Sequence, residues 1–310
     1  MNDDFRHMLV PLDGSSLAEA VLPYVRLLGK TPGTRVSLVH LVERGAPTSV
    51  HGERHLRSVQ DAEAYLAAVA VRLVADGLTV ETHVDTNEAG DTAGRIGEHA
   101  VEWDVDLIVL CAHGRSGIGR WLFGSIAQKV LAAGVAPVLL VRPQPTGTHA
   151  PVALRTILVP LDSTPEAEVA LPLAESIART TGARMRLLTV VPTAETLSGA
   201  MSSIARFSPT MTNTLLDDTE QAAMRYLDER AQRLTTAGVR AAGIVARGNP
   251  ADELVAAAKE VRADLLVMAS HGRQGLAGVW TGSVGNKLLA RIDSPFLLLR
   301  APGVPRNTGD

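Results

Sequence analysis

The feature that most constrains this chain is an internal repeat, because a segment that occurs twice predicts two copies of one fold. The run Met8-Leu-Val-Pro-Leu-Asp13 returns as Ile157-Leu-Val-Pro-Leu-Asp162, at an offset of 162 − 13 = 149 positions. A later stretch, from Asp106 to Arg115, returns from Asp264 to Arg273 at an offset of 264 − 106 = 158. The second copy has therefore gained nine residues between these two stretches.

The length of 310 residues fits this duplication, since it is about twice that of a typical domain. We expect one domain over residues 1–145 and a second over residues 154–302, with a linker at 143–153 and a tail at 303–310. The linker contains three prolines and lacks an apolar period. The extra residues fall in the segment from Pro192 to Asn213, which is rich in Ser, Thr and Met and predicts a long surface loop.

Short β-branched runs alternate with longer amphipathic stretches in both copies, which is typical of right-handed βαβ units on a parallel sheet. A helix is predicted from His55 to Asp76, and its counterpart from Thr214 to Ala237. The pattern predicts an α/β fold of two tandem, Rossmann-like, doubly wound domains, each a five-stranded parallel sheet flanked by four helices. The predicted strands are Met8–Leu12, Arg35–Val42, Thr79–Val84, Asp106–Ala112, Pro137–Val141, Ile157–Leu161, Met185–Val191, Arg240–Ala246, Asp264–Ser270 and Pro295–Leu299.

Composition excludes several classes of function. The net charge is −3 and no window concentrates Lys and Arg, which argues against a nucleic-acid partner. The longest apolar runs are far shorter than the ~20 residues that span a bilayer. The first residues lack the pattern of a signal peptide, so we expect a cytoplasmic protein without a membrane partner. The single Cys111 excludes an internal disulfide and a thiolate metal cluster.

Polar motifs follow the first and fourth predicted strands of each copy. Asp13 and Asp162 come directly after the first strand, and glycine-rich segments beginning at Gly114 and Gly272 follow the fourth. Nine residues separate these glycines from Gly124-Ser125 and Gly282-Ser283, which open a helix. Ligands of parallel sheets bind beyond the carboxyl ends of the strands, and a helix N-terminus attracts anions. The sequence therefore predicts a phosphate site in each copy.

A purely structural interpretation stays open for each of these motifs. Glycines at such positions also serve turns, and Asp13 and Asp162 either hold a ribose or purine edge or cap the next helix. His113 and His271 are expected to orient their loops, and Cys111 to be a small buried residue. There is no G-x-x-x-x-G-K-[ST] loop, no G-x-G-x-x-G after the first strand and no G-x-S-x-G elbow. We therefore expect nucleotide binding and no clear catalytic apparatus.

Both copies resemble the universal stress protein family, over residues 5–142 and 154–300. The most specific part of the resemblance is the family's nucleotide-binding pattern G-x2-G-x9-G-[ST]. Its second glycine, third glycine and hydroxyl map to Gly114, Gly124 and Ser125, and to Gly272, Gly282 and Ser283. The strand-end aspartate of the family maps to Asp13 and Asp162. The first glycine is replaced by Cys111 in one copy and by Ala269 in the other, and we expect the Ala269 copy to bind better.

The resemblance implies further site residues and partners. Pro11 and Leu41, with Pro160 and Val190 in the second copy, would line an adenine and ribose pocket. Ile126 and Val284 would offer backbone N–H groups to phosphate. The implied ligand is ATP or another adenine nucleotide, with Mg²⁺ accompanying the phosphates and no metal site of the protein's own. The family tends to dimerise through its last strand, so we expect the two copies to form a pseudo-twofold pair within one chain, besides any homodimer.

Three hypotheses about function follow. The first is a cytoplasmic stress-response protein that binds adenine nucleotide as a ligand or signal. The second is a structural or interaction module in which both glycine loops are vestigial. The third, a slow ATPase, is weaker because no general base is identifiable beside the glycine loop.

Overall fold

The computed structural model describes residues 5–43, 49–50, 53–54, 56–87, 90–112, 124–143, 151–197, 208–270, 288 and 291–301. The chain divides into two compact units. The first unit consists of Met1–Ala153 together with Asp293–Asp310, and the second is Leu154–Ile292. Each unit is described below by itself.

The first unit contains a sheet in the order β12-β7-β6-β1-β2-β5. The strands from β7 to β5 are parallel neighbours, and β12 is antiparallel to β7, with Phe296 opposite Leu140. The central strands are buried along nearly their whole length, as expected of a parallel sheet covered on both faces. The strands are β1 (His7–Pro11), β2 (Arg35–Glu43), β5 (Thr79–Asn87), β6 (Leu107–Cys111), β7 (Val138–Val141) and β12 (Phe296–Arg300).

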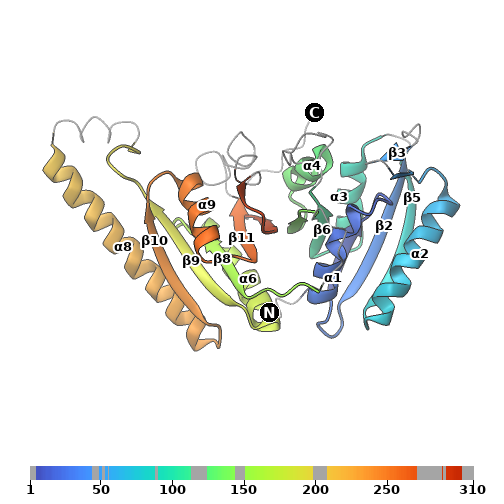
Figure 1. Cartoon of the computed structure of the whole chain (residues 1–310), viewed down its shortest axis with the longest axis horizontal. Coiled ribbons are helices and arrows are strands. Elements are labelled where there is room, and N and C mark those ends of the chain that lie inside the picture. Colours follow the sequence, from blue (N-terminus) through green and yellow to red (C-terminus); the bar gives the residue numbers. More distant parts are fainter. Residues whose placement is uncertain are drawn as a thin grey trace. The chain divides into compact units, whose positions relative to one another are not determined.

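Helices connect these strands as crossovers. In Figure 1, α2 lies along β2 and β5, against which it packs its buried residues Ala62, Leu66, Val69 and Leu73. Ser58 begins α2 because its side chain accepts a hydrogen bond from the Asp61 backbone N–H. The helical segments of this unit are η1 (Ala18–Val21), α1 (Leu22–Leu28), α2 (Val59–Ala75), α3 (Thr92–Glu102) and α4 (Ser125–Ala133). A small antiparallel pair, β3 (Ser49–Val50) and β4 (Glu53–Arg54), precedes α2.

The second unit repeats this plan with the sheet order β10-β9-β8-β11. All of its strand pairs with a defined register between β10 and β11 are parallel. The long helix α8 lies along β10 and β9, as α2 does along β5 and β2 (Figure 1). The elements are β8 (Thr156–Pro160), α5 (Pro165–Glu168), α6 (Ala170–Thr181), β9 (Arg184–Val191), α8 (Pro209–Thr236), β10 (Ala241–Arg247), α9 (Pro250–Glu260) and β11 (Leu265–Ser270).

The predicted fold class is confirmed, since both units are α/β with a mostly parallel sheet and flanking helices. One prediction is wrong: the loop expected through Asn213 gives way to helix at Pro209. Proline suits the first turn of a helix because the missing N–H has no intrahelical partner there. Residues 198–207 of that predicted loop lie outside the described residues. None of the helices in the described part of the chain is long and apolar enough to cross a membrane.

Candidate functional site

Three neighbouring strands of the first unit end side by side and bring the predicted site residues together. β6, β1 and β2 are parallel neighbours, so Cys111, Pro11 and the end of β2 lie at one edge of the sheet. Leu41, near the end of β2, is buried. Burial, and then the nearby charge of the Asp13 carboxylate, raise the pKa of the Cys111 thiol far above its usual range. Asp13 and Cys111 are therefore neighbours at this edge, and the thiol stays protonated.

The strand-end aspartates have the same local role in both copies. Asp13 Oδ1 accepts hydrogen bonds from the Ser15 backbone N–H at 2.9 Å and from the Ser15 hydroxyl at 2.6 Å. The Ser15 Oγ in turn accepts from the Ala18 backbone N–H at 3.1 Å, where the next helical turn begins. The Ser15 hydroxyl, oriented by Asp13, thus accepts the first backbone N–H of this helical turn.

The second copy reproduces this arrangement with threonine. Asp162 Oδ1 accepts from the Thr164 backbone N–H at 3.1 Å and from its hydroxyl at 2.6 Å. Thr164 is the N-cap of α5 and accepts from the Ala167 backbone N–H at 3.2 Å. In both copies the strand-end carboxylate thus orients a hydroxyl, that of Ser15 or Thr164, which accepts from the backbone N–H three residues further on. A role of Asp13 and Asp162 toward a ribose or purine remains a prediction.

Each copy has one buried polar residue that contacts the chain just after its first strand. The sequence analysis did not predict these two residues. His40 Nδ1 lies 2.7 Å from the carbonyl oxygen of Leu12, the residue before Asp13. At the equivalent place in the second copy, the Thr189 hydroxyl donates to the carbonyl of Leu161 at 3.0 Å. His40 and Thr189 are both buried, and they are separated by the repeat offset of 149 positions. A polar residue at matching positions of two apolar strands was the signal that could have found them.

The helix N-terminus predicted to bind phosphate is present in the first unit. Gly124 is the N-cap of α4, with an extended backbone at φ −60° and ψ 145°, and Ser125 is the first helical residue. Ser125 and Ile126 are exposed, so the first backbone N–H groups of α4 are at the surface. The N-terminal N–H groups of a helix have no intrahelical acceptors and carry partial positive charge. This end of α4 can therefore hold an anion.

The remaining predicted residues divide between described and undescribed parts of the chain. Pro160 ends β8, Val190 lies near the end of β9, and Ala269 is buried in β11 beside β8. These positions repeat those of Pro11, Leu41 and Cys111, although the Ala269 side chain is smaller than that of Cys111. The predicted residues Gly114, Gly272, Gly282, Ser283 and Val284 lie outside the described residues, as do His113 and His271.

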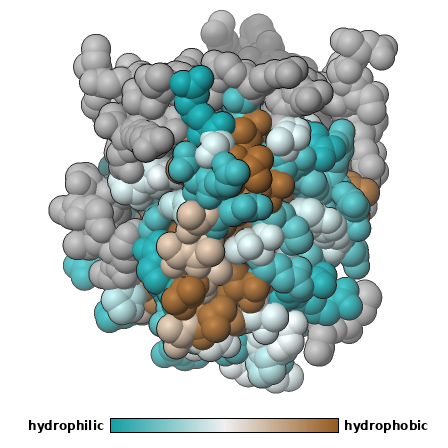
Figure 2. All heavy atoms as spheres, turned by 90° about the vertical axis from the view of Figure 1, so that its right-hand side faces the viewer, coloured by the Kyte–Doolittle hydropathy of each residue, from teal (hydrophilic) through white to brown (hydrophobic). Residues whose placement is uncertain are grey.

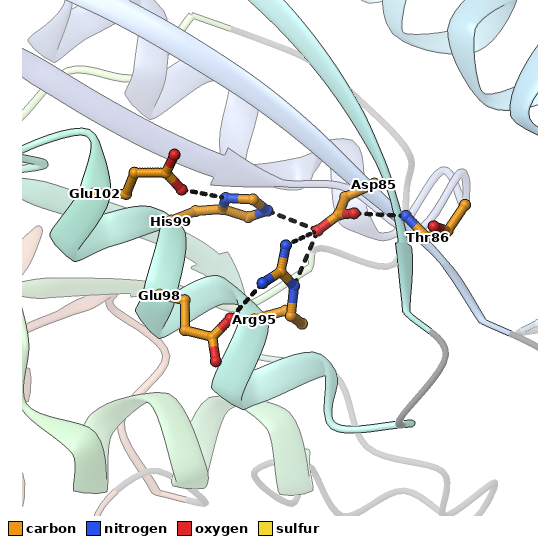
Figure 3. Close-up of polar contacts among 6 residues, drawn as sticks. All are labelled: Asp85, Thr86, Arg95, Glu98, His99 and Glu102. Carbon is orange, nitrogen blue, oxygen red and sulfur yellow. Dashed lines mark hydrogen bonds and ion pairs between the residues drawn. The ribbon is translucent and has the colours of Figure 1, made fainter.

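A cluster of charged side chains lies next to the predicted pocket residue Leu41, and sequence reasoning missed it as well. Asp85 of β5 pairs with Leu41 in the parallel register. Its Oδ2 accepts from Arg95 of α3, with Nε at 3.0 Å, and lies 3.0 Å from His99 Nε2 (Figure 3). His99 Nδ1 lies 3.7 Å from Glu102, and the His99 ring stacks on Trp103 with centroids 4.3 Å apart.

This cluster belongs to the first copy alone. In the second copy Ala246 stands beside Val190, where Asp85 stands beside Leu41. The helix positions of Arg95 and His99 are occupied by Glu253 and Ala257 in α9. Burial alone would raise the pKa of Asp85, but the hydrogen bond and charge of Arg95, with the hydrogen bond to His99, lower it below its usual range. The cluster therefore ties α3 to β5 through an ionised aspartate.

Comparison of the sequence with known protein families shows the family to which the chain belongs. The model of the universal stress protein family matches residues 4–142 and again residues 153–300. The chain belongs to the universal stress protein family. It carries two tandem universal stress protein domains, in agreement with the resemblance drawn from its glycine and aspartate motifs.

Individual relatives extend this comparison over the whole chain. A universal stress protein of Mycolicibacterium smegmatis is 24% identical over 304 residues, which are 94% of this chain and 96% of the relative. A universal stress protein of Mycobacterium tuberculosis is 28% identical over 204 residues, which cover 64% of this chain and 62% of that protein. The crystal structure of a universal stress protein from Archaeoglobus fulgidus shares the fold, with a TM-score of 0.67, 17% identity and coverage of 95% of this chain and 96% of that one.

The described part of the first unit contains three of the features predicted for the ligand site. These are the N-terminus of α4 at Gly124, the oriented Asp13 carboxylate after β1, and the apolar side chains of Pro11 and Leu41. Among the described residues, no group of three or more His, Cys, Asp or Glu side chains could hold a metal ion.

Proposed function

We propose that this universal stress protein binds an adenine nucleotide of the ATP type and acts in the cytoplasmic stress response as a ligand-binding or signalling protein. The observation that carries the proposal is the open N-terminus of α4 at Gly124 and Ser125. It lies in the same unit as the oriented Asp13 and the buried Leu41. The phosphates would bind at α4, and the base and ribose between Pro11, Asp13 and Leu41. Mg²⁺ would arrive with the phosphates.

In the second copy we propose the equivalent site, formed by Pro160, Asp162, Val190 and Ala269 together with Gly272, Gly282, Ser283 and Val284. The same family resemblance supports a strand-paired arrangement of the last strands. β12 is antiparallel to β7 in the first unit, and we propose that this pair takes the place of the pairing through which the family dimerises.

The first experiment identifies the ligand. Purified protein is denatured, the released small molecules are identified by mass spectrometry, and the stripped protein is titrated with ATP and Mg²⁺ in a calorimeter. We expect one or two binding events. A Gly124→Trp variant should lose the event that belongs to the first site, because an indole at the N-cap blocks the approach of phosphate to α4. A thermal melt controls for folding of the variant. Stripped protein that binds no adenine nucleotide at either site would refute the proposal.

One observation favours a second function. Cys111 and Ala269 carry side chains where the family pattern has its first glycine, and a side chain there narrows the approach to phosphate. A structural or interaction module with vestigial glycine loops would bind no nucleotide in the calorimeter. Its stress phenotype would survive both Gly124→Trp and Gly282→Trp. We propose that this protein does not hydrolyse ATP. If the rate of phosphate release is the same in wild type and in the Ser125→Ala and Ser283→Ala variants, the slow ATPase is excluded.

A further inference from the structure

A layer of polar and ionisable side chains lies between the sheet of the first unit and the helix α3. Figure 2 views the outer surface on the side of α2, where hydrophilic side chains surround a band of apolar ones. The layer is a separate, interior feature, because the His7 and His99 side chains are buried. Three histidines contact Trp103, the C-cap residue of α3. They are His7 of β1, His83 of β5 and His99 of α3.

Trp103 contacts its three histidines in different ways. Its ring stacks on that of His99, with centroids 4.3 Å apart, and lies against that of His83, with centroids 4.4 Å apart. Its backbone carbonyl oxygen lies 2.9 Å from Nδ1 of His7. The other ring nitrogen of His7, Nε2, lies 2.8 Å from the Ser37 hydroxyl. The His7 ring therefore joins β1 to β2 and to the end of α3.

A positive charge lies against the same ring. Nη2 of Arg35 is 2.9 Å from Nδ1 of His7. This nitrogen thus faces a charged donor as well as the Trp103 carbonyl, which accepts, and a neutral ring can bond with one of them at a time. Protonation of both ring nitrogens would set a second positive charge beside the guanidinium in a buried place. The closed arrangement therefore favours a neutral His7.

Two carboxylates face His7 from the remaining strands of this part of the sheet. Glu81 lies on β5, 3.7 Å from His83, and Asp106 lies directly before β6. The Asp106 carboxylate accepts from two backbone N–H groups, that of His7 at 3.2 Å and that of the preceding residue at 2.8 Å. Burial, with the charge of Arg35, keeps the pKa of His7 below its usual value, although a carbonyl contact and the two carboxylates act in the opposite direction.

The second copy shows that the fold does not require a histidine at this place. At the repeat offset of 149, Thr156 stands in the position of His7 and Arg184 in that of Arg35. Arg184 Nε donates to the Thr156 hydroxyl at 3.0 Å. Threonine has no titratable group, so this contact lacks the response of a histidine to pH. The positions of His83, His99 and Trp103 are occupied by Ile244, Ala257 and Val261.

We propose that His7 is a pH-sensitive contact, which lets the turn from Trp103 to Asp106 separate from β1 in acid, and that Thr156 removes this response from the second copy. An opening that brings the His7 ring into water restores its usual pKa of about 6.5. Because the closed form has the lower pKa, its stability against opening is complete above pH 6.5 and is lost as the pH falls toward the closed-form value.

The size of the response follows from the one extra proton that the open form binds. Each pH unit within that window raises the open population by at most about tenfold. Between pH 7.5 and pH 5.5 we expect a rise of about three- to tenfold, depending on how far the closed form lowers the pKa of His7.

Hydrogen exchange at matched amides of the two copies tests the proposal with the full chain. The Asp106 N–H donates to the carbonyl of His7 at 3.1 Å, and the Asp264 N–H donates to that of Thr156 at 2.8 Å. After correction for intrinsic exchange rates, protection at Asp106 should fall about three- to tenfold from pH 7.5 to pH 5.5. Protection at Asp264 should change by less than about twofold. Protection at Asp106 that stays constant, or that changes as at Asp264, overturns the proposal.

A variant with the residue of the second copy separates His7 from the other histidines. His7→Thr should make protection at Asp106 independent of pH over this range. The matched control is His83→Gln, which removes a histidine whose side chain is 37% exposed and should keep the response of wild type. A His7→Thr protein that responds to pH as wild type does contradicts the assignment to His7.

A titration of wild type followed by NMR needs no variant. The carbon-bound ring protons of His7 should titrate with a midpoint below pH 6.5, because the folded chain favours the neutral ring. A midpoint at or above pH 6.5 would show that the closed form does not resist protonation, and the proposal would fall.

Discussion

At the residue scale, the two copies differ most in the charged cluster around Asp85. The aspartate accepts from Arg95 and lies in contact with His99, whereas the second copy has alanine beside Val190 and in place of His99. The cluster links β5 to α3, and α3 packs against α4, whose N-terminus we propose as the phosphate site. The ion pair would thus support the site proposed in the first copy from a distance, and the site proposed in the second copy lacks this ion pair.

The lowered pKa of Asp85 predicts how stability depends on pH. Its folded-state pKa is below its unfolded value, so its contribution is present above the unfolded pKa and is lost as the pH falls through the folded one. Asp85→Asn should cost about 1–3 kcal/mol near pH 7. Urea unfolding at several pH values should show this difference shrinking below about pH 4.

A matched control for this experiment is Glu98→Gln. Glu98 pairs with the same Arg95, but its side chain is 63% exposed, and exposed ion pairs contribute little. We expect almost no change in the free energy of unfolding for this variant. A deficit of Asp85→Asn that stays constant from pH 7 to pH 3 would contradict the assignment of an ionised Asp85.

Residue identities could be predicted from the sequence only where the repeat made them visible. Asp13 and Asp162 stood out because both copies keep them, and the structure shows them in equivalent hydrogen bonds to Ser15 and Thr164. His40 and Thr189 contact equivalent carbonyl oxygens, those of Leu12 and Leu161. Because the two residues are of different types, comparing the two copies of the sequence did not reveal them. Asp85, Arg95 and His99 come from two elements, and only the fold brings them together.

At the element scale, the alternation of strands and helices was predictable, because the central strands are buried along nearly their whole length and the helices between the strands have an apolar side. The residues at which helices and strands begin and end were harder to predict. The start of α8 at Pro209 was missed because the Ser- and Thr-rich sequence around it has no apolar period, and Thr212 and Thr214 instead donate to carbonyls four residues earlier. Turn-forming composition alone does not exclude a helix.

The C-terminal end of α4 gives a prediction at this scale. Gly134 ends the helix in the left-handed region, at φ +59°, and a Cβ built on it would collide with Cδ of Arg300. Gly134→Ala should therefore cost more than the ~1–2 kcal/mol of the left-handed conformation, because the Arg300 side chain, which donates to the Ala132 carbonyl, must also move.

The matched control lies in the same unit at the end of α2. Gly77 has φ +88°, and a Cβ there meets nothing within 4 Å. Gly77→Ala should carry the conformational cost alone. Equal losses of unfolding free energy in urea for the two variants would show that Arg300 does not crowd Gly134.

At the scale of the whole molecule, the repeat and the compact units do not coincide. The repeat assigns the strand Phe296–Arg300 to the second copy, and the two domain boundaries drawn from the sequence stay predictions. By its contacts, β12 belongs to the first unit, where it pairs with β7 and where Arg142 reaches Asp293 at 2.6 Å. Local composition alone could not predict this, and the expectation that the two copies pair through their last strands came from the family resemblance.

Truncation tests where β12 contributes its stability. A chain that ends at Ile292 lacks β12 and should lose hydrogen-exchange protection at Val138 and Leu140 of β7, because the backbone of these two residues faces the missing strand, whereas that of Leu139 faces β6. A chain that ends at Ala301 keeps β12 and should protect these amides as the full chain does. Unchanged protection of β7 in the shorter chain would place β12 outside the first unit.

The discontinuity of the first unit also sets an order of events during synthesis. Translation must add 295 − 153 = 142 residues after Ala153 before β12 begins, which takes roughly 7–30 s at about 5–20 residues per second. During that interval the apolar run of β7 waits at an open sheet edge, where another nascent chain could pair with it. On a polysome, neighbouring chains reach this stage close together. Slow codons before Phe296 would lengthen the exposure and raise the fraction of chains that aggregate or require a chaperone.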